Sequence, residues 1–262
     1  MQSEQIASAV IMEAYSYPDY YDIAFGVADP GREVDFFEAA IRAHSRIPVR
    51  RVFEIACGTA PYLAEWHKRG YAYCGLDLSP AMLDAARAKA ARRGVPADFV
   101  AADMRDFAPE PVGGVDLVYL LLGSLYVASN SEFLGHLDRV SAVLPPGGLY
   151  LLDSVVWFEI FSDYRRRWTR RRAGVTVRMS YRAELIDAIT QTYNEFVTLD
   201  VDDHGARHRI ESRLPTKIFY PQEFLCLVEH SRAFEFIGWF NDFDLAAPVT
   251  PEGRHTTILR RR

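Results

Sequence analysis

The sequence has few cysteines, no long apolar run and no excess of positive charge, and each absence excludes a class of protein. Only three of the 262 residues are cysteine, and Cys57, Cys74 and Cys226 lack metal-ligand spacing. This odd number fits a reducing compartment better than a disulfide scaffold. No stretch reaches the ~20 apolar residues of a membrane span, and the N-terminus shows no basic segment before an apolar one. We therefore expect a cytoplasmic protein with no membrane partner.

The charge balance argues against nucleic acid as a partner. The formal net charge is -5, which provides no electrostatic footprint for a phosphate backbone. Hydrophobic residues make up 49% of the chain, enough to bury the core of one elaborated domain or of a domain with a cap. We expect a small-molecule substrate.

From about residue 50, short β-branched or aromatic runs alternate with longer helical segments. This pattern is typical of βαβ units with a parallel sheet. Ser79 and Pro80 supply an N-cap and a first-turn proline for one helix, and Gly94 closes it. The predicted strands are 49–56, 71–76, 98–102, 115–122 and 149–152, and the predicted helices are 61–69, 80–93 and 131–144.

After Asp153 the pattern changes to period two. Polar and apolar residues alternate in 175–181, 193–201 and 208–214, with a turn signal at 202–205, which predicts antiparallel strands. A final helix (221–234) and two closing strands (236–243 and 255–260) are expected to follow. We predict an α/β fold: a doubly wound, seven-stranded Rossmann-like sheet with an antiparallel β insertion after the fifth strand.

A ligand site is predicted where the first two strands end. Gly58 lies between a strand and a helix, where glycine lets the backbone approach a ligand. Asp77 ends the next strand 19 residues later, where a carboxylate can accept hydrogen bonds from a ribose diol. The pair predicts an adenosine site, although an exposed aspartate beside an ordinary βαβ turn is the alternative. Pro61 stands where a dinucleotide fingerprint needs glycine, which disfavours NAD and FAD.

Asp103 and Met104 end the third predicted strand. A carboxylate there can take an adenine amino group and a thioether can pack on the ring, whereas the alternative is a surface loop.

Four segments resemble, in order and spacing, the successive motifs of class I S-adenosylmethionine (SAM) methyltransferases: EIACGTA at 54–60, GLDLSP at 75–80, ADMRDF at 102–107 and LPPGG at 144–148. The Ala-Cys-Gly form, the DMRDF string, Tyr21-Asp22 and the predicted insertion resemble N,N-dimethyltransferases of nucleotide-linked amino sugars. The resemblance implies SAM as cofactor and N-methylation of an amine. O- or C-methylation of a natural product and a non-catalytic SAM- or nucleoside-binding protein remain alternatives.

The resemblance also implies residue roles. Gly58 and its neighbours are expected near the methionine moiety, Asp77 at the ribose, and Asp103 with Met104 at the adenine. The predicted cofactor-binding residues are Tyr21, Glu54, Ala56, Cys57, Gly58, Asp77, Leu78, Asp103, Met104 and Leu120. Glu54 replaces the family's usual aspartate and Ala60 its usual glycine, so we expect a Cβ beside the methionine part of the cofactor.

Tyr126 and Tyr21 are the predicted catalytic residues. Tyr126 follows the fourth strand and Gly123-Ser124, where it could contact the nucleophile; histidine commonly stands there in the amino-sugar group, and a half-buried structural tyrosine is the alternative. Tyr21 belongs to an aromatic stretch that could cover a cationic sulfonium or fasten an N-terminal helix to the core. The stretch comprises Tyr15, Tyr17, Tyr20, Tyr21 and Phe25.

Three further features have two interpretations each. Asp153 could orient a substrate or cap a loop. The arginine-rich run 165–172 could bind a carboxylate or phosphate, or form a solvated edge strand. His204 and His208 lack companion ligands, so we predict no metal site.

The chain is thus predicted to have four segments, and the exposed edge of the third would permit a homodimer or, if covered, a monomer. They are an N-terminal helical and aromatic lid (1–48), a SAM-binding Rossmann-like core (49–154), an antiparallel insertion serving as substrate cap or dimer element (155–220), and a last helix with a closing hairpin (221–262).

Overall fold

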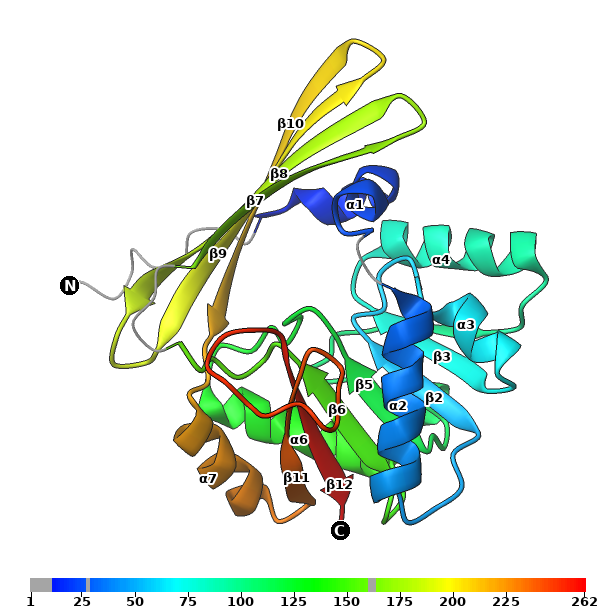
Figure 1. Ribbon diagram of the computed structural model, residues 1–262, viewed down its shortest axis with the longest axis vertical. Coiled ribbons are helices and arrows are strands. Elements are labelled where there is room, and N and C mark those ends of the chain that lie inside the picture. The colour runs from blue at the N-terminus through cyan, green and yellow to red at the C-terminus, as the bar shows by residue number, and fades with distance from the viewer. Residues whose placement is uncertain (1–10, 27–28, 160–163) are drawn as a thin grey trace.

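The computed structural model describes residues 11–26, 29–159 and 164–262, which form two β-sheets with helices around the larger one (Figure 1). The strands of the larger sheet are β2 (Arg51–Ile55), β3 (Ala72–Asp77), β4 (Asp98–Ala101), β5 (Leu117–Leu120), β6 (Leu149–Asp153), β11 (Phe234–Asn241) and β12 (His255–Arg261). Their order is β11-β12-β6-β5-β2-β3-β4. Strands β2 to β6 pair in parallel, and β12 and β11 pair antiparallel to their neighbours. The carboxyl ends of the parallel strands therefore meet at one edge.

Helices cover both faces of this sheet. They are α2 (Pro30–His44), α3 (Leu63–Lys68), α4 (Pro80–Arg93), α5 (Pro109–Val112), α6 (Asn130–Val143) and α7 (Pro221–Ser231). One buried cluster joins α2, α3 and α4 to one face, and another joins α5, α6 and α7 to the opposite face. The predicted doubly wound, seven-stranded fold is confirmed.

Local chemistry explains where several elements begin and end. Helix α4 begins after Ser79, whose hydroxyl accepts from the Met82 amide, and ends at Gly94 in the left-handed conformation. The prediction extended one strand through residue 122, but β5 ends at Leu120 because Leu122 has a φ of 57°, which extended pairing does not allow.

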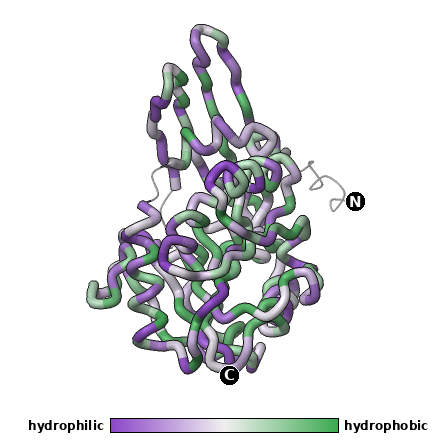
Figure 2. Tube along the Cα trace, turned by 90° about the vertical axis from the view of Figure 1, so that its right-hand side faces the viewer, coloured by the Kyte–Doolittle hydropathy of each residue, from purple (hydrophilic) through white to green (hydrophobic). Residues whose placement is uncertain are grey.

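The smaller sheet is the predicted antiparallel insertion. It contains β7 (Arg165–Arg172), β8 (Val175–Asp187), β9 (Thr192–Asp203) and β10 (Ala206–Lys217), and β1 (Ile11–Met12) pairs with the outer edge of β10. The sequence reasoning expected only helix in the N-terminal segment; β1 forms because β10 presents unpaired backbone groups at its edge. Figure 2 shows hydrophilic and hydrophobic residues interspersed along these projecting strands.

A short N-terminal segment connects the two sheets. The 3-10 helix η1 (Glu13–Ser16) and α1 (Pro18–Ala24) pack under the smaller sheet, where Ala14, Ile23 and Ala24 join its buried cluster. Residues 1–10 and 27–28 of the predicted lid and 160–163 of the predicted insertion lie outside the described residues. In the described ranges, no helix combines the length and apolar character that crossing a membrane requires.

Candidate functional site

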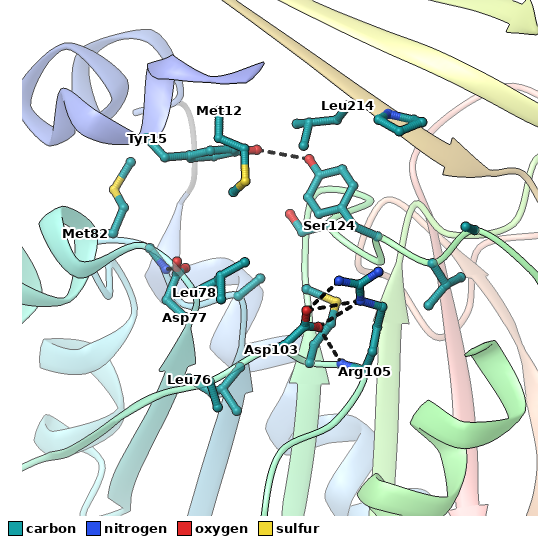
Figure 3. Close-up of a pocket in the computed structure, with 18 of the residues that line it drawn as sticks. Met12, Tyr15, Leu76, Asp77, Leu78, Met82, Asp103, Arg105, Ser124 and Leu214 are labelled. Atoms are coloured by element: carbon teal, nitrogen blue, oxygen red, sulfur yellow. Dashed lines mark hydrogen bonds and ion pairs between the residues drawn. The ribbon is translucent and has the colours of Figure 1, made fainter. Parts of the chain in front are cut away.

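A first cavity lies beyond the carboxyl ends of β2, β3 and β4 (Figure 3). Gly58 lines it from the loop after β2, Asp77 from the end of β3, and Asp103 from the loop after β4. Tyr15 of η1 and Tyr126 of the loop after β5 line it from the side of the smaller sheet. Three adjacent strand ends and the N-terminal segment therefore build one site.

Backbone amides hold Asp77 in place. Its Oδ2 accepts from the Gly58 amide and its Oδ1 from the Ser79 amide, both at 2.8 Å. Burial raises the pKa of this carboxyl, and the amide donors oppose the rise. Gly58 has a φ of 53°, and a Cβ built on it would meet no atom within 4 Å. The backbone at Gly58 is thus open to a ligand, as a glycine there predicts.

Asp103 and Met104 both line the first cavity, and each also contacts a neighbouring side chain. The Asp103 carboxylate forms an ion pair with Arg105 at 2.6 Å, and this partner lowers its pKa. The Met104 carbonyl accepts from His136 Nδ1 at 2.8 Å, and His136 Nε2 lies 2.6 Å from the Tyr150 hydroxyl. Burial lowers the pKa of His136 to about 4, so a neutral imidazole fixes this loop.

Three predicted cofactor residues do not line the first cavity. Glu54 is buried on the opposite side of β2, where Tyr73 and Tyr119 donate to its carboxyl group and burial raises its pKa to about 8. Cys57 is buried in the loop, and Leu120 lies in the core between β5 and α6. The other predicted cofactor residues do line it, namely Tyr21, Ala56, Gly58, Asp77, Leu78, Asp103 and Met104.

Ala60 differs from its expected position. Its side chain is fully buried in the cluster formed with α2, α3 and α4, and it does not line the first cavity. Its φ of 52° explains why glycine is favoured there, because the left-handed region is unfavourable for a residue with a Cβ. The Ala60 side chain therefore belongs to the core cluster.

The predicted catalytic tyrosines lie together. The hydroxyls of Tyr126 and Tyr15 are 3.0 Å apart, and the rings of Tyr15 and Tyr21 are 5.5 Å apart. Burial raises the pKa of all three phenols well above the ordinary value. At neutral pH these hydroxyls are protonated, so they can hydrogen-bond a ligand but are poor proton acceptors.

The aromatic stretch divides between its two predicted roles. Tyr15 and Tyr21 line the first cavity, whereas Tyr20 donates to Asp203 of the smaller sheet at 2.9 Å. Phe25 stacks on Tyr21 at 4.3 Å between ring centroids and meets Trp168 of β7 edge-on. The stretch both covers the cavity and fastens α1 to the smaller sheet.

A second cavity adjoins the first under the smaller sheet. Ser124 lines the first cavity and its neighbour Gly123 lines the second. Glu195 of β9 and Tyr181 of β8 line the second cavity from above. Burial raises the pKa of the Glu195 carboxyl to about 7, and Tyr181 opposes the rise. The two cavities together can hold two ligands side by side.

Asp153 does not line either cavity. It is fully buried and forms an ion pair with Arg254 at 2.8 Å, and Arg254 also reaches Glu33 of α2 at 3.1 Å. Arg254, and not Asp153, lines the second cavity. Of the arginine-rich run, Arg166 lines the second cavity, while β7 as a whole is the exposed outer strand of the smaller sheet.

Sequence reasoning missed Glu195 and Arg254 as site residues. Glu195 did leave a signal, because it stands in phase with Val197, Leu199 and Val201 on the apolar face of β9. A charged residue on such a face is unusual. Arg254 left none, since its partners are far away in the sequence. No group of three or more His, Cys, Asp or Glu side chains in the described ranges is placed to hold a metal ion.

Comparisons with known proteins agree with this architecture. Residues 52–148 match the family model of a methyltransferase domain. A demethylmenaquinone methyltransferase of Thermus thermophilus is 31% identical over 51% of this chain and 60% of that protein. The dTDP-3-amino-3,6-dideoxy-alpha-D-glucopyranose N,N-dimethyltransferase of Streptomyces fradiae is 28% identical over 86% of this chain and 82% of that protein.

A solved structure extends the similarity to both sheets. SAM-bound CalS10, an amino pentose methyltransferase from Micromonospora echinaspora, superposes with a TM-score of 0.72 at 24% identity, covering 92% of this chain and 96% of that one. The predicted class I methyltransferase fold is thereby confirmed. The chain spans only 54% to 60% of the length of three curated methyltransferase relatives that it matches.

Proposed function

We propose that this protein is a SAM-dependent methyltransferase that methylates the amine nitrogen of a small molecule. The observation that carries the proposal is the pair of adjoining cavities. The first is lined by the motif residues at the ends of β2, β3 and β4, and the second lies beside it beneath the smaller sheet. A cofactor and an acceptor need such adjacent sites.

The residues of the first cavity fit SAM. Each Asp77 oxygen accepts one backbone amide and keeps a lone pair for a ribose hydroxyl. The exposed backbone at Gly58 suits the methionine moiety, and Met104 with Leu78 suits the adenine. Asp103 shares its acceptor capacity between Arg105 and the adenine amino group.

SAM, when bound, supplies an electrophilic methyl group on a sulfonium, so little covalent chemistry is required of the protein. The chain's own task is to bind the acceptor in line and to exclude water. Tyr15, Tyr21 and Tyr126 line the first cavity with aromatic rings and protonated hydroxyls. Such rings suit a neighbouring cation.

The amine acceptor is supported by the amino-sugar dimethyltransferase of Streptomyces fradiae. Its similarity extends over 86% of this chain, and so well beyond the methyltransferase domain. The polar side chains of the second cavity include Arg166, Glu195 and Arg254, which suit an acceptor with charged groups.

Titration calorimetry with SAM and, separately, with NAD tests the cofactor. We expect saturable SAM binding and no NAD binding. Asp77→Ala should weaken SAM binding about 100-fold, because charge-assisted hydrogen bonds to the ribose are lost. Asp84→Ala is the control, since Asp84 is exposed on α4 and pairs with Arg87. Unchanged SAM binding in a folded Asp77→Ala protein would falsify the site assignment.

Formation of S-adenosylhomocysteine tests the acceptor. A dTDP-linked 3-amino-3,6-dideoxy sugar and its 3-hydroxy counterpart serve as matched probes. We expect turnover of the amine only. Turnover of the hydroxyl probe at an equal rate would favour O-methylation.

A further inference from the structure

We propose that Glu195 binds the ammonium group of the acceptor and takes its proton, which restricts this site to amines, an inference that rests on the proposed function. Glu195 belongs to the smaller sheet, outside every motif of the methyltransferase domain.

The position of Glu195 on β9 directs it toward the site. Side chains alternate between the faces of a strand, so Glu195 shares a face with Val197, Leu199 and Val201. Those three residues are buried in the cluster that the sheet forms with α1. Glu195 is on the same face but beyond the cluster, where it lines the second cavity.

Glu195 lines the second cavity, and its negative charge also acts on the first. That charge contributes to the raised pKa values of Tyr15, Tyr21 and Tyr126, which line the first cavity. An acceptor nitrogen bound at Glu195 is therefore next to the cofactor cavity. This is the place that methyl transfer requires.

The carboxylate lacks a cationic partner. Tyr181 of the neighbouring strand lines the same cavity, but across residues 11–26, 29–159 and 164–262 no lysine, arginine or histidine forms an ion pair with Glu195. A half-buried carboxylate without a counter-ion is unfavourable. An acceptor ammonium would supply the missing charge and donate hydrogen bonds, whereas a hydroxyl would leave the charge unpaired.

The proton then has a defined destination. An ammonium cannot attack a methyl group until one N–H bond breaks and leaves its electron pair on nitrogen. The proton moves to the Glu195 carboxylate, which becomes a carboxylic acid, and later passes to water. With burial raising the pKa of Glu195 to about 7, the carboxylate is a better proton acceptor than an exposed glutamate. The lone pair forms the new N–C bond, and the methyl–sulfur electron pair stays on a neutral thioether.

Other ionisable groups face the same space. Burial raises the pKa of Tyr15, Tyr21, Tyr126 and Tyr181, so these phenols stay neutral near pH 7. The second cavity is also lined by Glu159, Tyr164, Arg166 and Arg254. We therefore expect titration of Glu195 to produce a rise in kcat/KM with an apparent pKa near 7.

Glu195→Gln is the decisive variant and Glu211→Gln its matched control. Glu211 lies on the adjacent strand β10, exposed and paired with Arg209. Calorimetry measures the amine and 3-hydroxy sugar probes on protein loaded with S-adenosylhomocysteine, and steady-state kinetics are recorded from pH 6 to 9. For Glu195→Gln we expect unchanged SAM affinity, about 100-fold weaker amine binding and loss of the rise near pH 7. Glu211→Gln should behave as the wild type.

Each outcome has a distinct meaning. A Glu195→Gln protein that keeps amine affinity and pH profile overturns the role of Glu195 but leaves the proposed function intact. Wild-type protein that binds SAM but shows no preference for the amine probe also overturns it. Wild-type protein that binds no SAM overturns the proposed function itself, and the role of Glu195 with it. Glu195→Asp keeps the charge and should retain the amine preference, so it replaces Glu195→Gln if that protein does not fold.

Discussion

The two cavities are built in different ways from the same chain. In the first, Asp77 is held by the amides of Gly58 and Ser79, which are 19 and 2 residues away. In the second, Arg254 bonds to Asp153 and Glu33, which are 101 and 221 residues away. The first cavity depends on backbone near each strand end, and the second on side chains from distant elements.

This difference reflects what each cavity binds under the proposed function. A cofactor of constant structure can be held by a short motif in a βαβ unit, which many related proteins share. An acceptor requires particular charges in particular places, and those come from an insertion and from the chain's last residues. The methyltransferase domain match ends at residue 148, before Glu195 and Arg254.

The largest effect is expected from removing the cation of the buried ion pairs beside the second cavity. Arg254→Met should lower the free energy of unfolding by about 3 kcal/mol, because Asp153 and Glu33 are left buried without a cation. Urea denaturation measures this change. SAM affinity should persist, since Arg254 does not line the first cavity.

Arg209→Met is the control for that change, because Arg209 pairs with Asp200 and Glu211 at the exposed surface. Arg209→Met should leave the free energy of unfolding nearly unchanged. Equal effects of the two substitutions would contradict the distinction between buried and exposed pairs.

A substitution at Gly58 tests the backbone-built cavity. Gly58→Val should weaken SAM binding about 100-fold, because valine is disfavoured at a φ of 53° and its side chain would occupy ligand space. Gly114→Val is the matched control, since Gly114 is exposed with open space and no left-handed φ. Calorimetry compares the two, and equal loss of affinity would show that position 58 is not special.

The hydrogen bond between Tyr15 and Tyr126 is tested by removing one hydroxyl. Tyr126→Phe should reduce kcat about tenfold with little change in SAM affinity, because one hydrogen bond of about 1 kcal/mol is lost. Tyr15→Phe removes the other half of the same bond. In a double-mutant cycle the double variant should lose little more than either single one. Fully additive losses would show that the two hydroxyls act separately.

The smallest expected effect is a change in stability with pH that is due to Glu54, a buried acid that lines neither cavity. The folded pKa of Glu54 is raised to about 8, above its unfolded value, so its stability contribution is lost as pH rises toward 8. Between pH 7 and 8 the free energy of unfolding should fall by about 1 kcal/mol, and Glu54→Gln should remove that slope. Chemical denaturation at each pH measures it.

Glu195→Gln is the control for Glu54, because the raised pKa of Glu195 lies near 7 and the window above it belongs mainly to Glu54. That variant should keep the slope between pH 7 and 8. If Glu195→Gln abolished the slope, Glu195 and not Glu54 would be the acid that causes the loss of stability between pH 7 and 8.

Much of the first cavity could be predicted because its signals are local. Ser79 and Gly94 delimit α4 as expected, and Gly58 and Asp77 meet because parallel neighbouring strands end at one edge. Ala60 packs in the core, and the direction of its Cβ depends on a left-handed turn that the residue type does not favour. Glu54 points away from the cavity because of its phase along β2, which turns its side chain toward Tyr119.

The doubly wound sheet, the antiparallel insertion and the residues at the strand ends could be read from local patterns, because hydrophobic period, helix caps and glycine positions act over a few residues. Three features depend on contacts between distant segments: the face of β9 that lines a cavity, the pairing of β1 with the smaller sheet, and the position of Arg254 between Asp153 and Glu33. Those contacts join segments far apart in the chain. Their geometry depends on how the two sheets pack, which no local pattern encodes.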